Sequence, residues 1–179
     1  MKRNRYARFE APQGDFYETN PEAVELLLTV ETFSEKVWEC ACGNGSISEV
    51  LKRHGYEVLS TDLYDHGYGE TGIDFLEADI SARDIITNPP YNQAREFIEH
   101  SLEILNPRHK AAFFLRLDFL GSKKRKPLFA EYPPARVYVL TGRQACKRNG
   151  EQEFKRSAVD HCWYIWEQGF KGEPVIRWL

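Results

Sequence analysis

The sequence predicts an α/β fold in which helices cover both faces of a doubly wound, mostly parallel sheet. Short apolar runs alternate with amphipathic helical segments along the chain, as expected for such a sheet. One apolar run, Val37-Trp38, leads into the turn Gly43-Asn44-Gly45 and then into a helical pattern. Another, residues 84–87, leads directly into Asn88-Pro89-Pro90-Tyr91. No low-complexity tract or long linker divides the 179 residues, so residues 1–179 are predicted to form a single domain.

In the first half of the chain, three strands are predicted to alternate with two helices. Asn20 and Pro21 are a favourable N-cap and first-turn pair, and the helix they begin extends to about residue 31. Ser46 is the expected N-cap of a second helix, which Gly55 ends. The strands expected around these helices cover residues 36–40, 57–61 and 73–76.

The second half continues the alternation with longer apolar runs. Residues 84–87 form a buried strand, and the following helix over residues 91–105 has one apolar face. Residues 110–117 are the longest apolar strand, and residues 123–131 form a short basic helix. The remaining strands are expected at residues 136–141 and 160–167, with residues 174–179 as a candidate last strand.

Charged residues are segregated along a chain whose formal net charge is only −3. Residues 15–105 are predominantly acidic, whereas residues 106–156 are predominantly basic. Such segregation favours a surface that faces a polyanion, although a solvated helix start would also explain part of it. The residues that we expect to contact nucleic acid are Lys123, Lys124, Arg125, Lys126, Arg143, Lys147 and Arg148.

Composition and cysteine usage exclude several classes of protein. A content of 42% hydrophobic and 13% aromatic residues is that of a folded protein rather than a disordered one. No stretch approaches the roughly 20 apolar residues of a membrane-spanning helix, and the charged N-terminus is not followed by the apolar segment of a signal peptide. The four cysteines lack zinc-site spacing, so we interpret them as buried thiols of a cytoplasmic protein and expect no metal.

The strand that runs into the glycine turn is typical of sites for a nucleoside-bearing cofactor. Ligands of doubly wound sheets lie at the carboxyl ends of strands, where Gly43 and Gly45 would let a cofactor approach the backbone. Asp62 follows at a spacing suited to a carboxylate that binds ribose hydroxyls, and Glu39 is a candidate partner for an ammonium group. A second pattern, residues 67–72, also reads GxGxxG. Because it neither follows a strong strand nor begins an apolar helix, we interpret it as a mobile loop.

The segment from Asn88 to Tyr91 has the residue types needed to activate an exocyclic amine. The lone pair of such an amine is delocalised into its ring, and two acceptors aimed at its hydrogens favour the pyramidal, nucleophilic nitrogen. Asn88 Oδ1 and the Pro89 carbonyl oxygen can supply both acceptors, and the prolines restrict the chain. Tyr91 offers a ring face for a base. An activated methyl donor such as S-adenosylmethionine would then need positioning rather than a strong general base.

These motifs and their order resemble the amino-methyltransferases that make N6-methyladenine in DNA, particularly the short, phage-type members. The resemblance extends from about residue 15 to the strand that contains residues 162–166, through residues 16–22, 39–45, 62, 74–76 and 88–91. It implies a Rossmann-like methyltransferase fold, S-adenosylmethionine as cofactor, and duplex DNA with a flipped adenine as partner. No separate target-recognition domain is visible, so we expect the loop at residues 142–158 to read a short or relaxed site. A monomer or weak dimer is expected, in the bacterial host cytoplasm if the protein is phage-encoded.

The resemblance also implies roles for individual residues. Thr19 and its neighbours would contact the methionine end of the cofactor, Asp74 its adenine amino group and Phe75 its adenine ring, with Asp79 as a rival to Asp74. Relatives place an aromatic residue near the target base where this chain has Cys146, and Phe154 is a candidate substitute. The expected catalytic residues are Asn88, Pro89, Pro90 and Tyr91. The expected cofactor-binding residues are Tyr17, Thr19, Glu39, Cys42, Gly43, Gly45, Asp62, Leu63, Asp74, Phe75 and Asn88.

Other functions remain open on the same motifs. RNA and protein-glutamine amino-methyltransferases share the tetrapeptide chemistry, although the glutamine enzymes usually carry an N-terminal helical domain for which there is little room before residue 36. A catalytically silent subunit that only binds the cofactor is the non-enzymatic alternative. The intact Asn88 to Tyr91 segment argues against that alternative.

Overall fold

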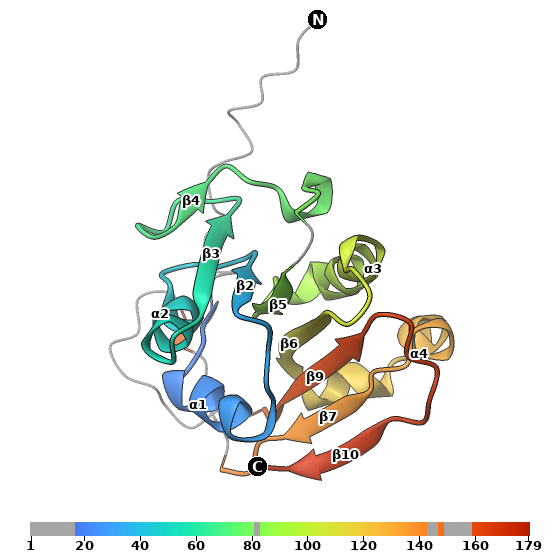
Figure 1. The fold of residues 1–179 in the computed structure, drawn as a ribbon. Helices are drawn as coiled ribbons and strands as arrows, with labels where there is room; N and C mark the ends of the chain where they lie inside the picture. The colour runs from blue at the N-terminus through green and yellow to red at the C-terminus, as the bar shows by residue number, and fades with distance from the viewer. Residues whose placement is uncertain (1–16, 81–82, 143–146, 149–158) are drawn as a thin grey trace, which may run out of the picture.

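The computed structural model describes residues 17–80, 83–142, 147–148 and 159–179, and its centre is an eight-stranded sheet (Figure 1). The strand order is β10-β7-β9-β6-β5-β2-β3-β4. The strands are β2 (Lys36–Glu39), β3 (Glu57–Asp62), β4 (Glu70–Thr71), β5 (Asp84–Thr87), β6 (Lys110–Arg116), β7 (Arg136–Val139), β9 (His161–Glu167) and β10 (Val175–Trp178). Neighbouring strands are parallel except that β9 is antiparallel to β6 and β7. The predicted doubly wound, mostly parallel sheet is therefore confirmed.

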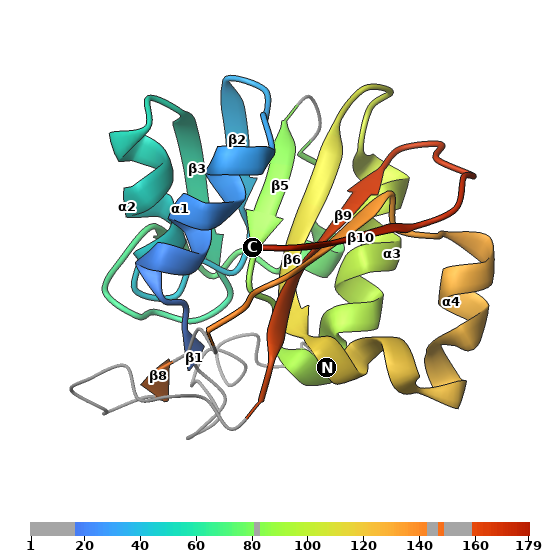
Figure 2. The ribbon, with the colours of Figure 1, turned by 90° about the horizontal axis from the view of Figure 1, so that it is seen from below.

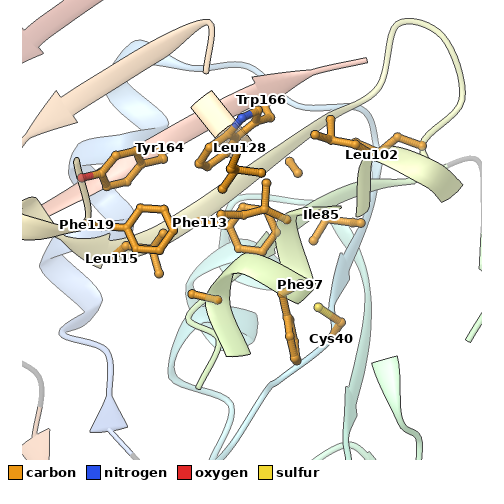
Figure 3. Close-up of a cluster of buried hydrophobic side chains, with 14 of the residues drawn as sticks. Cys40, Ile85, Phe97, Leu102, Phe113, Leu115, Phe119, Leu128, Tyr164 and Trp166 are labelled. Atoms are coloured by element: carbon orange, nitrogen blue, oxygen red, sulfur yellow. The ribbon is translucent and has the colours of Figure 1, made fainter. Parts of the chain in front are cut away.

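Helices cover both faces of the sheet, as predicted (Figure 2). Helices α1 (Pro21–Val30) and α2 (Ser46–Arg53) pack on one face, while α3 (Ala94–Ile104) and α4 (Lys126–Glu131) pack on the other. Alternate side chains of each central strand enter opposite cores, because strand side chains point to opposite faces in turn. In β6, Phe114 packs with α1 and α2, whereas Phe113 and Leu115 join the cluster under α3 and α4 (Figure 3).

The two helix starts on the first face differ in how they are capped. Asn20 caps α1 as predicted, because its side chain accepts a hydrogen bond of 3.1 Å from the Glu22 amide. The prediction that Ser46 caps α2 is wrong. Gly45 is the N-cap, with φ +84°, and Ser46 is the first helical residue, whose hydroxyl donates to Asn44 Oδ1 over 2.7 Å. The left-handed turn, which glycine adopts readily, takes the place of a side-chain cap.

The predicted strand at residues 73–76 is wrong as well. Residues Phe75–Glu77 form a short 3₁₀ helix, η2, and the Asp74 carboxylate caps it by accepting from the Leu76 amide over 3.1 Å. An acidic cap at the right spacing decided the local structure against a short apolar run. The strand that follows β3 is β4, which has only two residues and lies within the segment 67–72 that we interpreted as a loop. It pairs with the end of β3, with Thr71 opposite Asp62.

Further short elements surround the carboxyl ends of the strands. The 3₁₀ helices are η3 (Tyr91–Gln93), which precedes α3, and η4 (Leu117–Gly121) and η5 (Lys123–Arg125), which connect β6 to α4. A separate two-stranded antiparallel sheet joins β1 (Tyr17–Glu18) to β8 (Lys147–Arg148). Cys40, Cys42 and Cys162 are buried free thiols, as predicted, and Cys146 lies outside the described residues. Within the described part of the chain, no helix is long and apolar enough to cross a membrane.

A buried ion cluster fastens the end of α1 to the amino-terminal ends of two strands. The Glu31 carboxylate accepts hydrogen bonds from Lys110 Nζ over 2.7 Å, from Tyr138 Oη over 2.8 Å and from the Arg136 guanidinium. Burial alone would raise the pKa of Glu31, but these three donors together hold it below the ordinary value. Glu31 is therefore charged in the native protein at neutral pH, and the cluster is a structural one.

We expect Glu31→Gln to destabilise the protein at pH 7 and to make its free energy of unfolding less dependent on pH in the acid range. A carboxyl group whose pKa is lowered by folding stabilises the native state above its unfolded-state pKa, and this contribution is lost as the pH falls through the folded pKa. The loss at pH 7 should be about 3 kcal/mol, because two half-buried cations lose a buried counter-ion, and among the described residues only Arg136 keeps a second one, in Glu167. Urea unfolding between pH 3 and pH 7 measures both effects, with the exposed Glu35→Gln as matched control. Equal pH dependence in both variants would contradict the assignment.

Candidate active site

A cavity of about 230 Å³ opens at the carboxyl ends of β2, β3 and β5, where parallel strands end on one edge of the sheet. It brings the two main sequence motifs together, although they are far apart in the chain. The predicted residues that line it are Tyr17, Thr19, Glu39, Cys42, Asp62, Leu63, Asp74, Phe75, Asn88, Pro89, Pro90 and Tyr91. Gly43 and Gly45 do not line it, and the rival residue Asp79 does not either. The cavity is therefore built from both motifs.

Gly43 and Gly45 support the wall of the cavity although they do not line the cavity. The Gly43 amide donates to Asp62 Oδ2 over 2.8 Å, and the Tyr64 amide donates to Asp62 Oδ1 over 2.9 Å. Gly45 is left-handed, and a Cβ atom there would lie 2.6 Å from the ring of Tyr68. The glycine turn thus lets the chain pass under Tyr68 and fixes the carboxylate of Asp62 at the edge of the cavity.

Burial raises the pKa of two further groups in this half of the cavity, Glu39 and Cys42. The Glu39 side chain is almost fully buried, and desolvation raises its pKa well above the usual range despite a hydrogen bond from the Ser48 hydroxyl. Burial, together with the charges of Glu39 and Asp62, raises the pKa of the Cys42 thiol to about 12. Cys42 is therefore a neutral wall of the cavity at pH 7, not a nucleophile.

An aromatic wall closes the same half of the cavity next to Asp74. The ring of Phe75 lies 4.7 Å from that of Phe97 and 5.1 Å from that of Trp38, measured between centroids. Phe97 comes from α3 and lines the cavity while also belonging to the core (Figure 3). The sequence predicted one apolar face for this helix, and nothing in the helical pattern distinguishes a core position on that face from one that also faces a ligand.

Asn88 follows β5 and is held by the segment around β1. Its Nδ2 atom donates to the Tyr17 carbonyl oxygen over 3.1 Å and to Thr19 Oγ1 over 3.0 Å. Because the amide nitrogen is committed to these two acceptors, the orientation of the carboxamide is set, and Oδ1 is its acceptor end. Asn88 therefore has the fixed geometry of a hydrogen-bond acceptor in the cavity.

Tyr91 is held from two sides. Its ring stacks on that of Tyr17, with centroids 5.6 Å apart and an interplanar angle of 28°. Its hydroxyl lies 3.2 Å from Nε2 of His161, a buried residue at the start of β9. The imidazole of His161 in turn stacks on Phe114, with centroids 5.0 Å apart. His161 was not predicted as part of the site, because it is distant in sequence and lies in an otherwise apolar strand.

Other cavity residues were also missed by sequence reasoning. They are Glu18, Cys40, Ala41, Ser46, Ile47, Tyr64, His66, Ile73, Asn92, Gln93 and Phe97. Tyr64 and His66 follow Asp62 closely, so their position after a cofactor-binding carboxylate was an available signal. Asn92 and Gln93 directly follow the tetrapeptide and are exposed at its end of the cavity.

The predicted basic residues divide into three groups. Lys123, Lys124 and Lys126 are exposed on η5 and the start of α4. These elements follow the carboxyl end of β6, which is parallel to β5, so they lie on the same edge of the sheet as the cavity. Arg125 instead donates to the Phe119 carbonyl over 2.6 Å and to the Asp118 carbonyl over 3.0 Å, so its guanidinium is bound within the chain. The third group, Arg143 and the side chains of Lys147 and Arg148, lies outside the described residues. So do Cys146 and Phe154, which the sequence placed near the target base.

Comparison with known proteins places this fold among methyltransferase structures. No family model and no curated protein matches the sequence. A proposed class I S-adenosylmethionine-dependent methyltransferase from Listeria monocytogenes superposes with a TM-score of 0.67 at 12% identity, covering 95% of this chain and 68% of the other. A proposed RNA methyltransferase from Pyrococcus horikoshii gives a TM-score of 0.60 at 13% identity over 83% and 82%. The modification subunit of a proposed type I restriction enzyme from Vibrio vulnificus gives 0.59 at 15% identity over 89% and 46%.

These similarities establish a Rossmann-like methyltransferase fold, as the sequence predicted. At such low identity they show the fold alone, and the similar proteins differ in their substrates. The chain spans less than half of the restriction-enzyme subunit. The chemistry of this chain must therefore be argued from its own residues.

Proposed function

We propose that the protein is an S-adenosylmethionine-dependent methyltransferase that methylates the exocyclic N6 of adenine in DNA. The observation that carries the proposal is that Asn88, Pro89 and Tyr91 share one cavity with Glu39 and Asp62. One group of residues suits a nucleoside-bearing cofactor and the other an aromatic amine. A methyl transfer needs both within the same site.

The residues in the first half of the cavity fit S-adenosylmethionine. The carboxylate of Asp62 is held by two backbone amides and is placed to accept ribose hydroxyls, and Phe75 and Phe97 form an apolar wall for an adenine ring. A methionine ammonium beside Glu39 would favour the charged carboxylate and lower its raised pKa, because a neighbouring cation offsets the cost of burying a carboxylate. When bound, the cofactor supplies a sulfonium-activated methyl group.

The residues in the second half fit a heterocyclic amine as methyl acceptor. Asn88 Oδ1 accepts one amino hydrogen, and the Pro89 carbonyl oxygen accepts the other, which localises the nitrogen lone pair for attack. Proline at position 90 contributes no backbone N–H that would compete for these acceptors. The ring of Tyr91 supports the base. No strong general base would be required before transfer, since the amine would attack in its neutral form. The methylated nitrogen would then be cationic and would release one proton to solvent.

Two features favour an adenine of a nucleic acid over other acceptors. The resemblance to adenine-N6 methyltransferases implies that an asparagine-led tetrapeptide suits adenine, and the exposed cations at Lys123, Lys124 and Lys126 lie on the cavity edge of the sheet, where they would bind phosphates. The base would reach the cavity only by flipping out of the duplex. RNA is the main alternative, because the same cations serve either polymer, and a Pyrococcus horikoshii protein with this fold is a proposed RNA methyltransferase. We propose a monomer or weak dimer in the cytoplasm.

Incubation with methyl-labelled S-adenosylmethionine and separate pools of duplex DNA, RNA and peptide tests the proposal. Digestion to nucleosides should place the label in N6-methyladenine from DNA. Label confined to RNA or to peptide would overturn the substrate assignment. If no pool were labelled by a protein that still binds the cofactor, a silent cofactor-binding subunit would become the better description.

A further inference from the structure

We infer that Tyr17 is the second aromatic wall of the acceptor site, so that a flipped base is held between its ring and that of Tyr91. This inference rests on the proposed function and deepens it. The sequence did not identify the second aromatic residue of the acceptor site, because Cys146 stands where relatives place one. The sequence grouped Tyr17 with the cofactor, whereas its contacts belong to the other half of the cavity.

The contacts of Tyr17 are with the tetrapeptide that binds the acceptor. Its ring stacks on that of Tyr91, and its carbonyl oxygen accepts a hydrogen bond from Asn88 Nδ2. The side chain and the main chain of one residue thus contact both functional groups of the tetrapeptide. The carboxylates that define the cofactor half make no such contact with the tetrapeptide among the hydrogen bonds described: Asp62 accepts from the Gly43 and Tyr64 amides, and Asp74 accepts from the Leu76 amide.

Insertion of a base between the two rings requires only a small movement. The centroids of the Tyr17 and Tyr91 rings are 5.6 Å apart, and a planar base between them needs about 7 Å, which is two layers at optimal carbon–carbon separation. The hydroxyl of Tyr91 is held by its hydrogen bond with His161, which is itself buried and stacked on Phe114. Tyr17 is half-buried on a strand of only two residues. The ring of Tyr17 is therefore the one that moves.

The strand that carries Tyr17 is paired with the basic segment of the chain. β1 and β8 are antiparallel, and Tyr17 is opposite Arg148 while Glu18 is opposite Lys147. Lys147 and Arg148 are among the residues predicted to contact nucleic acid. The backbone of this two-stranded sheet therefore joins the proposed base-binding ring to the segment that would meet the phosphates, which places the ring beside the polymer.

Substitutions of Tyr17 separate this role from cofactor binding. Tyr17→Leu and Tyr17→Gln remove the stacking face, whereas Tyr17→Phe and Tyr17→Trp keep one. We expect the first pair to lower kcat/KM for mixed-sequence duplex DNA by about 5- to 150-fold, the range that corresponds to one base–aromatic stack. The second pair should stay within about threefold of the wild-type protein. All four should bind S-adenosylhomocysteine like the wild type, by calorimetry.

The control is Tyr56→Leu, a half-buried tyrosine outside the cavity, which should leave both measurements unchanged. Weakened cofactor-product affinity with unchanged kcat/KM for DNA would assign Tyr17 to the cofactor and overturn the inference, as would wild-type kinetics in both non-aromatic variants. Failure of the proposed function would be visible in the wild-type protein itself. If that protein methylated RNA instead, the same four variants measured on RNA would still test Tyr17.

Discussion

Replacing Asn88 with alanine should reduce kcat by about 10²- to 10³-fold while leaving cofactor affinity within about threefold of the wild-type value. The loss is of the size seen when one preorganised hydrogen-bonding group is removed from a transition state. Asn88 Oδ1 acts on the acceptor amine, whereas Asp62 is held by the Gly43 and Tyr64 amides, so the loss of the Asn88 side chain leaves the ribose-binding carboxylate in place. Single-turnover rates and calorimetry with S-adenosylhomocysteine measure the two quantities.

Asn106→Ala is the matched control, because Asn106 is an exposed asparagine on the loop before β6, outside the cavity. It should retain full activity. If the Asn88→Ala protein were folded and turned over at the wild-type rate, the role of the tetrapeptide would be wrong. A large loss of cofactor affinity would instead move Asn88 into the cofactor half.

Replacing Asp62 with alanine should weaken binding of S-adenosylhomocysteine by about 100-fold. Two hydrogen bonds from ribose hydroxyls to a carboxylate would be lost, each worth roughly 1.5–3 kcal/mol before compensation. The amides of Gly43 and Tyr64 would also lose their acceptor, which loosens the turn that shapes the cavity. Asp62→Asn keeps one acceptor oxygen and should lie between the alanine variant and the wild-type protein.

Asp65→Ala provides the comparison for this experiment. Asp65 also accepts a backbone hydrogen bond, from Gly67 over 2.8 Å, but it is exposed and does not line the cavity. Its loss should leave cofactor affinity unchanged. Unchanged affinity in a folded Asp62→Ala protein would show that the cofactor does not occupy this half of the cavity.

Much of the fold was predictable because its main signals are local. The apolar runs of β5 and β6 are short, which favours buried strands over helices, and Asn20 with Pro21 marks the start of α1. Both site motifs follow strands, and the carboxyl ends of parallel strands meet at one edge. Their shared cavity therefore followed from the strand assignments alone.

What could not be predicted depends on contacts between distant segments or on competition within a few residues. The Asp74 carboxylate turned an apolar run into a capped 3₁₀ helix, and Gly45 displaced Ser46 as the cap of α2. The stacking of Tyr17 on Tyr91 joins a residue of β1 to one of η3, two elements far apart in the chain, which no periodicity reports. The guanidinium of Arg125 binds two carbonyl groups of its own chain, so the basic run alone overestimates the number of cations available to bind a polyanion.

Direct transfer from prebound cofactor to adenine tests the central claim, that one cavity holds both reactants. The protein is loaded with methyl-labelled S-adenosylmethionine and mixed with duplex DNA and a large excess of unlabelled cofactor. The claim predicts a burst of labelled N6-methyladenine that approaches the enzyme concentration in the wild-type protein. The Asn88→Ala protein should hold the same cofactor but show almost no burst. Equal bursts in the two proteins, or no label in DNA from wild-type protein that holds the cofactor, would contradict the claim.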